Sequence, residues 1–169
     1  WDQETWMPKK GIAERSEQLG LMEGMIHERL PSDEVGELLA EAESSAGALD
    51  GNPAGNWSPA AGGDTAGRAG SGSDFPDDVR AFLRALRREY DRATKIPNRL
   101  VVELAKEVST AQSVWVDARS RDDFGDFAPH LERLLNLNIE KAEAVGYERH
   151  PYDALLDEYE PWMTSEKVG

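Results

Sequence analysis

The stretch HPYDALLDEYEPWMT, His150 to Thr164, predicts a short helix bounded by a proline at each end. Pro151 suits the first turn of a helix because its missing N–H would have no intrahelical partner there. Pro161 ends the helix, and Glu160 before it is pushed toward an extended backbone. Three side chains at helical spacing form the predicted apolar face: Leu155, Leu156 and Tyr159.

Two acids of this stretch, Asp153 and Asp157, lie near the N-terminal end of the predicted helix, where the positive end of the helix dipole favours them. We expect the apolar face to dock on a core and Asp157 to lie exposed on the polar side. In that arrangement the apolar face contributes more to stability than the acids do.

The rest of the chain is also helical in pattern. Residues 1–8 read as the end of a helix stopped by Pro8, and residues 122–127 read as a capped turn. No alternating run predicts a strand, so the predicted fold class is all-α. Apolar residues recurring every three to four positions predict five further helices, at 11–30, 33–46, 77–95, 97–120 and 129–145.

The faces of these helices that we expect to be buried are apolar stripes. Gly20 and Gly24 each weaken the first helix by up to about 1 kcal/mol against Ala, but two small residues four apart also allow another helix to approach closely. In chain order the stripes are Ile12, Leu19, Met22, Ile26 and Leu30 flanked by Met25; Val35, Leu38, Leu39 and Ala42; Val79, Phe82, Leu83, Leu86 and Tyr90; Leu100, Leu104, Val108, Ala111 and Trp115; and Leu131, Leu134, Leu135, Asn138 and Ala142.

Residues 47–76 differ in character from their surroundings, being rich in Gly, Ala, Ser, Asp and Pro without periodicity. This composition predicts a flexible connection. The chain therefore divides into N-terminal helices at 1–46, the Gly/Ser/Pro-rich segment at 47–76 and a helical segment at 77–169.

Composition limits the classes of partner. The 169 residues include 19 basic and 33 acidic side chains, a net charge of −14, which repels nucleic-acid phosphates and anionic membranes. No apolar run approaches the ~18 residues of a membrane span. There is no cysteine, which fits the cytoplasm. Because the first residue is Trp1 rather than Met, we expect a longer chain.

The chain holds three histidines, and no two of them are three or four residues apart: His27, His130 and His150. His27-Glu28 begins like HExxH, the motif that places two zinc-binding imidazoles one turn apart, but Pro31 occupies the second ligand position. We therefore expect His27 on a polar helix face and His130 as a capping or packing residue in a first turn. No catalytic, cofactor-binding or metal-binding set is predicted within the chain.

Four arginines form a local basic stripe in an otherwise acidic chain: Arg84, Arg87, Arg88 and Arg92. Two interpretations are open. The arginines pair with acids of their own helix, each pair contributing a few tenths of a kcal/mol, or they form a patch that binds a peptide carboxylate.

Four phrases carry a family resemblance. The stretch His150–Thr164 resembles the M32 metallocarboxypeptidases, the carboxypeptidase Taq family, and so does the opening WDQETWMP of Trp1–Pro8. RREYDRAT at Arg87–Thr94 and DDFGDFAPHLERLL at Asp122–Leu135 follow the same order and spacing. The resemblance covers most of this chain but only the first third or so of a family member, and residues 47–76 look like an insertion into a shorter link.

The resemblance implies an N-terminal segment of a zincin-type, mostly helical metallopeptidase that removes C-terminal residues from peptides with broad specificity. Zinc or a similar divalent ion would be bound by an HExxH motif and a downstream Glu beyond Gly169, and the full-length protein would be a cytoplasmic homodimer. This segment would form one wall and the cover of the substrate groove. The residues predicted for that wall are Trp1, Asp2, Met7, Tyr152, Asp153, Tyr159 and Glu160.

Two alternatives remain open from the sequence. An M3-like oligoendopeptidase carries a related Tyr-Asp-Ala-Leu-Leu-Asp phrase, although the opening Trp-Asp-Gln-Glu-Thr is closer to M32. A non-catalytic, acidic helical interaction module is the other. A reading frame that continues past Gly169 into HExxH would eliminate the second alternative.

We predict that the 169-residue chain alone has no peptidase activity and binds no stoichiometric zinc, because it lacks HExxH and any pair of histidines at ligand spacing. The purified chain would be incubated with peptides that vary at the C-terminus, and its metal content measured by mass spectrometry. Turnover that survives repurification, or one tightly held zinc per chain, would contradict the prediction.

Overall fold

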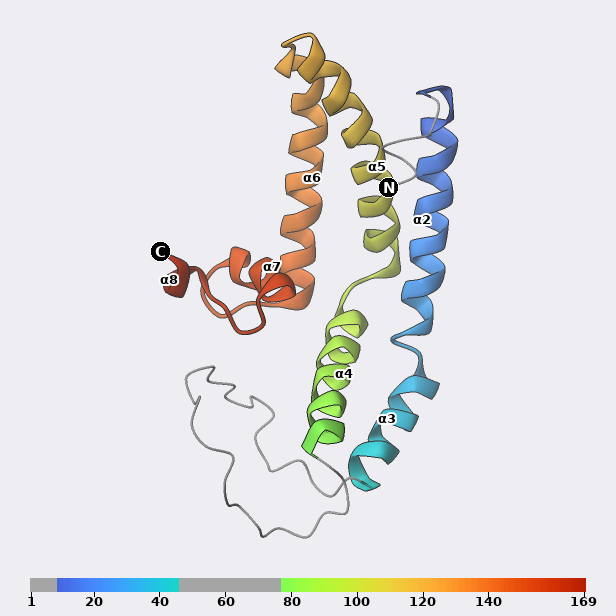
Figure 1. Ribbon diagram of the computed structural model, residues 1–169, viewed down its shortest axis with the longest axis vertical. Helices are drawn as coiled ribbons and strands as arrows, with labels where there is room; N and C mark the ends of the chain where they lie inside the picture. Colours follow the sequence, from blue (N-terminus) through green and yellow to red (C-terminus); the bar gives the residue numbers. More distant parts are fainter. Residues whose placement is uncertain (1–8, 46–76) are drawn as a thin grey trace. The chain divides into compact units, whose positions relative to one another are not determined.

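The computed structural model describes residues 9–45 and 77–169, and within these ranges every regular element is a helix, which confirms the all-α prediction (Figure 1). Predictions that concern residues 1–8 and 46–76 lie outside the described residues. No described helix combines the length and apolar character needed to cross a membrane. The elements are η1 (Lys9–Gly11), α2 (Ile12–Arg29), α3 (Asp33–Ser45), α4 (Asp77–Lys95), α5 (Asn98–Ser120), α6 (Phe124–Val145), α7 (Pro151–Tyr159) and α8 (Ser165–Val168).

The chain forms two compact units. Of the described residues, the larger unit contains 9–30 and 92–169 and the smaller contains 31–45 and 77–91, and the boundary falls within α4. The division into 1–46, 47–76 and 77–169 stays a prediction.

In the larger unit, α5 is the middle helix. It packs against α2 on one side and α6 on the other, so that the three helices lie side by side (Figure 1). α7 packs on α6, and α8 follows against α7. The buried side chains of α5 are small or at its first turn: Leu100, Ser109, Ala111 and Ala118.

The buried face of α2 is not the predicted apolar stripe. Its buried residues are Ser16, Gly20 and Gly24, whereas Met22, Met25 and Ile26 are 55%, 55% and 60% exposed. A methyl group at Gly20 would lie 2.7 Å from Lys106 Cγ, and one at Gly24 would lie 2.7 Å from Val102 Cγ2. The glycines therefore let α5 approach the backbone of α2, as their spacing predicted, and this contact turns the larger side chains away.

Charged pairs connect α5 with α6. Arg133 lies 3.2 Å from Glu103 Oε2 and 3.2 Å from Glu107 Oε2, and Arg99 pairs with Glu140. His130 Nδ1 lies 2.6 Å from Glu107 Oε1. His130 is thus a packing residue between the two helices.

α6 begins earlier than predicted. It starts at Phe124, so Pro129 lies inside the helix rather than opening it, and His130 lies beyond the first turn. The predicted separate turn is absent because Asp122, at φ 53°, reverses the chain and Asp123 N–H donates to the Ala118 carbonyl at 2.9 Å. Asp adopts this left-handed conformation more readily than most residues. Leu135, predicted as buried, is 57% exposed, while Leu137 is buried.

The smaller unit has its own apolar cluster. Leu39 of α3 and Leu83 of α4 are buried, and Val79, Leu86 and Tyr90 pack against them. α4 has the predicted bounds, 77–95. Leu38 and Phe82 were predicted as buried but are 59% and 63% exposed, because each lies at the edge of its stripe, turned away from the Leu39–Leu83 contact.

Arg87 of the basic stripe also lies in this unit, and it pairs with an acid of a different helix. Arg87 Nη2 is 2.6 Å from Glu43 Oε2 of α3, and its Nη1 is 3.7 Å from Asp91. The bond to Glu43, together with that acid's charge, raises the pKa of Arg87. The stripe therefore joins helices as well as pairing within one.

We predict that Gly24→Leu lowers the free energy of unfolding by about 1–3 kcal/mol, the usual cost of overpacking, since Val102 is short and β-branched and cannot move aside. The matched control is Met25→Leu, at a 55% exposed position of the same helix. This substitution should change the free energy of unfolding by less than about 0.5 kcal/mol. Denaturant unfolding measures both. Equal stability of the two variants would show that α2 and α5 do not approach closely.

Candidate functional site

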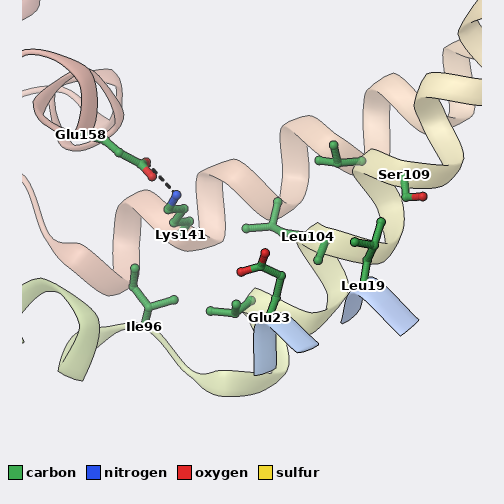
Figure 2. Close-up of a pocket in the computed structure, with 10 residues that line it drawn as sticks. Leu19, Glu23, Ile96, Leu104, Ser109, Lys141 and Glu158 are labelled. Carbon is green, nitrogen blue, oxygen red and sulfur yellow. Dashed lines mark hydrogen bonds and ion pairs between the residues drawn. The ribbon is translucent and has the colours of Figure 1, made fainter. Parts of the chain in front are cut away.

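The larger unit contains an open pocket of about 440 Å³ (Figure 2). Its walls come from α2, the residue before Pro97, α5, α6 and α7, so it requires the packing of segments far apart in the sequence. The lining residues are Leu19, Glu23, Ile96, Val101, Leu104, Ala105, Val108, Ser109, Lys141 and Glu158.

One wall is apolar and belongs to a single face of α5. Val101, Leu104 and Val108 follow one another at three- and four-residue spacing, which places them on one side of the helix. Val108 is 53% exposed. Among the described residues, this wall therefore presents apolar surface to water.

The opposite part of the pocket is charged. Lys141 Nζ of α6 lies 2.7 Å from Glu158 Oε2 of α7, and Arg92 Nη2 lies 3.5 Å from the same oxygen. Figure 2 shows Glu23 extending from α2 into the space between Leu104 and Lys141. A carboxylate therefore faces the pocket interior beside a lysine that is already paired.

Arg92 holds α7 in place. Its Nη2 donates to the Ala154 carbonyl at 2.9 Å and its Nη1 to Asp157 Oδ2 at 3.3 Å. The Arg92 side chain is only 10% exposed. Ala154, which it contacts, is the buried residue of α7.

The sequence predicted that Asp157 lies exposed on the polar side of α7. In the structure, both of its carboxylate oxygens instead have partners. Its Oδ1 accepts the Trp162 N–H at 2.7 Å while Oδ2 faces Arg92. Trp162 has φ 63°, a conformation that costs a residue with a Cβ roughly 1–2 kcal/mol. Asp157 thus stabilises a strained turn, and the acids contribute to the docking of this segment.

The two ends of α7 agree with the sequence prediction, but the side of α7 that is buried is not the predicted apolar face. His150 Nδ1 accepts the Tyr152 N–H at 3.1 Å, Pro151 is the first residue and Glu160 is extended. Tyr159, predicted as part of the docking face, is 83% exposed. The face is shifted because the small Ala154, one residue before Leu155, sits at the contact.

The four predicted wall residues that the structure describes do not line this pocket. Tyr152 is 52% exposed, Glu160 is exposed and Tyr159 projects into solvent. Asp153 Oδ1 accepts the Ser165 N–H at 2.7 Å, and this backbone bond holds the pKa of Asp153 below its usual value. Trp1, Asp2 and Met7 lie outside the described residues.

Sequence reasoning missed Lys141 and Glu158 as site residues and placed Arg92 only in the basic stripe. Lys141 and Glu158 each resemble many other surface charges in the sequence, and no spacing links them across 17 positions. Only the docking of α7 on α6 brings them together.

The described residues do not fit a metal centre. No group of three or more His, Asp and Glu side chains within 9–45 and 77–169 converges closely enough to hold an ion. His27, the half-buried start of the broken HExxH pattern, instead lies with Nε2 2.8 Å from the Ile96 carbonyl oxygen. We therefore assign no metal-dependent step to these side chains.

Comparison with known proteins gives a consistent result. The sequence model of the carboxypeptidase Taq (M32) metallopeptidase family matches residues 1–169. Thermostable carboxypeptidase 1 of Thermus thermophilus is 35% identical over 178 residues, which cover 99% of this chain and 30% of the relative. The BsuCP crystal structure has a TM-score of 0.78 at 28% sequence identity, and the match covers 99% of this chain and 29% of that chain. The structure of Pyrococcus furiosus carboxypeptidase (apo-Mg) has a TM-score of 0.67 at 30% identity, and the match covers 99% of this chain and 28% of that chain.

We predict that Arg92→Met lowers the free energy of unfolding by about 2 kcal/mol, because the Ala154 carbonyl and Asp157 Oδ2 lose their donor and Glu158 loses one of its two cationic partners. The estimate is below that for fully buried pairs since Asp157 and Glu158 are 29% and 41% exposed. The control, Arg149→Met, removes a pair whose partners are both 70% exposed and should change the free energy by less than about 0.5 kcal/mol. If both variants unfold like the parent in denaturant, Arg92 does not hold α7.

Proposed function

Because the chain belongs to the carboxypeptidase Taq (M32) metallopeptidase family, we propose that it is part of a metal-dependent hydrolase that removes C-terminal residues from peptides with broad specificity. The observation that carries the proposal is the family match over residues 1–169. This match favours M32 over the M3-like alternative. The chain spans about 30% of the length of the curated relatives it matches, so the activity is proposed for the polypeptide to which it contributes.

We propose that this segment contributes a wall and cover of the substrate groove rather than the reacting groups. The α7 region supports the proposal, because Tyr152, Tyr159 and Trp162 are 52%, 83% and 47% exposed on a segment that Arg92 and Asp157 hold in place. Aromatic side chains on a fixed backbone provide contact area at low entropic cost. Asp153 and Glu160, and Trp1, Asp2 and Met7, stay proposed members of this wall.

The divalent metal, zinc or a similar ion, would supply Lewis-acid activation of the scissile carbonyl and of a water molecule. Since the described residues hold no suitable ligand set, its ligands are proposed to lie elsewhere in the polypeptide. The contribution of this chain would be to orient the peptide and limit access of water and of long or folded substrates to the groove.

A homodimer and a cytoplasmic location complete the proposal. The absence of cysteine in the 169 residues is compatible with a reducing compartment. Gel filtration of the whole polypeptide tests the dimer.

The activity is tested on the whole polypeptide with unstructured peptides, by mass spectrometry of the products over time. We expect residues to be released one at a time from the C-terminus, and a chelator to abolish release. Cleavage at internal bonds, or release from the N-terminus, would contradict the proposal. No release by the metal-loaded polypeptide would favour the non-catalytic alternative.

The wall is tested with Tyr159→Ala, which should lower kcat/KM severalfold, equivalent to about 1 kcal/mol of contact energy, without changing stability, since the ring is 83% exposed. Tyr147→Ala, at a 43% exposed tyrosine outside α7, is the matched control. Equal kcat/KM in the two variants would remove Tyr159 from the wall.

A further inference from the structure

The three long helices of the larger unit form one layer with two unlike faces. α5 lies between α2 and α6, so its two flanks are covered and its two remaining sides belong to the faces of the layer (Figure 1). Each α5 residue can be assigned to a flank or a face by its position around the helix.

One face is charged and internally paired. Arg99 pairs with Glu140 and lies 4.0 Å from Glu103, and Arg121 lies 3.3 Å from Asp117. These side chains are between 39% and 59% exposed. Such a face is suited to water.

The opposite face of α5 is apolar. Val101, Leu104, Val108 and Trp115 recur at spacings of three, four and seven, about half a turn from the charged positions. Val108 is 53% and Trp115 49% exposed. The pocket described above lies on this face, where Leu19 of α2 extends it. We call this set — Leu19, Val101, Leu104, Val108 and Trp115 — the apolar face.

A layer with one apolar face needs a second layer. Folded domains bury such a face against other secondary structure, and contiguous exposed apolar patches mark interfaces. Within the described residues, nothing fills the pocket on this face, which keeps about 440 Å³ open. The charged face has no comparable need, so the covering element is expected on one side only.

Glu23 adds a chemical requirement to the covering element. Its carboxylate extends into the pocket between Leu104 and Lys141 (Figure 2), and no described residue forms an ion pair with it. A carboxylate that is covered without a donor would pay a large desolvation cost. The covering element must therefore combine apolar side chains with a Lys, Arg or other donor opposite Glu23.

We propose that the apolar face is covered by another part of the same polypeptide, a segment outside these 169 residues that packs apolar side chains on Val108 and Leu104 and donates to Glu23. The chain matches only 28% to 30% of each curated relative, so most of such a polypeptide is available to form the second layer. A second copy of this chain fits less well, because it would bring another acidic surface, from a net charge of −14, toward Glu23.

The test uses thiol labelling, which is direct because the 169 residues contain no cysteine. Val108→Cys places a thiol on the apolar face and Asp117→Cys places the control on the charged face of the same helix, at parent exposures of 53% and 52%. Each variant is labelled with a small maleimide in the whole polypeptide and in the 169-residue chain, and the modified peptide is identified by mass spectrometry.

We expect the two cysteines to react at similar rates in the 169-residue chain. In the whole polypeptide Val108→Cys should react at least about tenfold more slowly than Asp117→Cys, because its thiol is reached only when the second layer opens. Equal rates in the whole polypeptide would overturn the proposal. Protection that also appears in the 169-residue chain and grows with its concentration would overturn it in favour of a second copy. The readout does not depend on peptidase activity.

Discussion

The close contact of α2 with α5 is the constraint on which the larger unit depends. Gly20 and Gly24 contribute no side chain at this contact, so the side chains of Val102 and Lys106 of α5 pack directly on the backbone of α2. Backbones this close gain dispersion contacts along the helix at the cost of two positions with poor helix propensity. The remaining flank of α5 is then free to receive α6 through the Glu103, Glu107 and Arg133 pairs.

A second set of polar contacts positions α7 on this layer. Arg92 connects the Ala154 carbonyl with Asp157 and Glu158, and Asp157 in turn holds the strained backbone of Trp162. One guanidinium thereby contacts three residues of α7, the helix that carries two of the exposed aromatic side chains, Tyr152 and Tyr159. Within residues 9–45 and 77–169 few large apolar side chains are buried, and charged pairs form many of the contacts between helices.

A small apolar core supported by charged pairs is consistent with the proposal that this chain is a segment of a larger enzyme. The M32 relatives are named as carboxypeptidases, and the chain matches less than a third of each. In the proposed function, a wall built from helices joined by ion pairs presents aromatic and acidic side chains to a peptide, and the reacting groups come from another part of the polypeptide. In the two proposals made above, the apolar face of α5 and the aromatic side chains of α7 have different roles, the first toward the rest of the polypeptide and the second toward a peptide substrate.

Several features of the fold and site were predictable from the sequence because they depend on local rules. The all-α class, the bounds of α4, and the Pro151 start and Glu160 end of α7 follow from apolar periodicity and proline chemistry alone. The family phrases were equally readable, because they are strings of residues rather than contacts. The pocket was not predictable, since Lys141 and Glu158 are ordinary surface charges until α7 docks on α6.

The buried faces were decided only by tertiary structure. An apolar stripe shows which side of a helix can be buried, but α2 buries Ser16, Gly20 and Gly24 because backbone proximity to α5 outweighs the burial of Met22, Met25 and Ile26. In the same way Ala154 rather than Tyr159 marks the inner side of α7. The sequence by itself thus determined the all-α class, the position of most described helices and the family, but not the start of α6 or the presence of α8. Tertiary structure decided which of their faces meet, because that choice depends on the shape of the neighbouring helix.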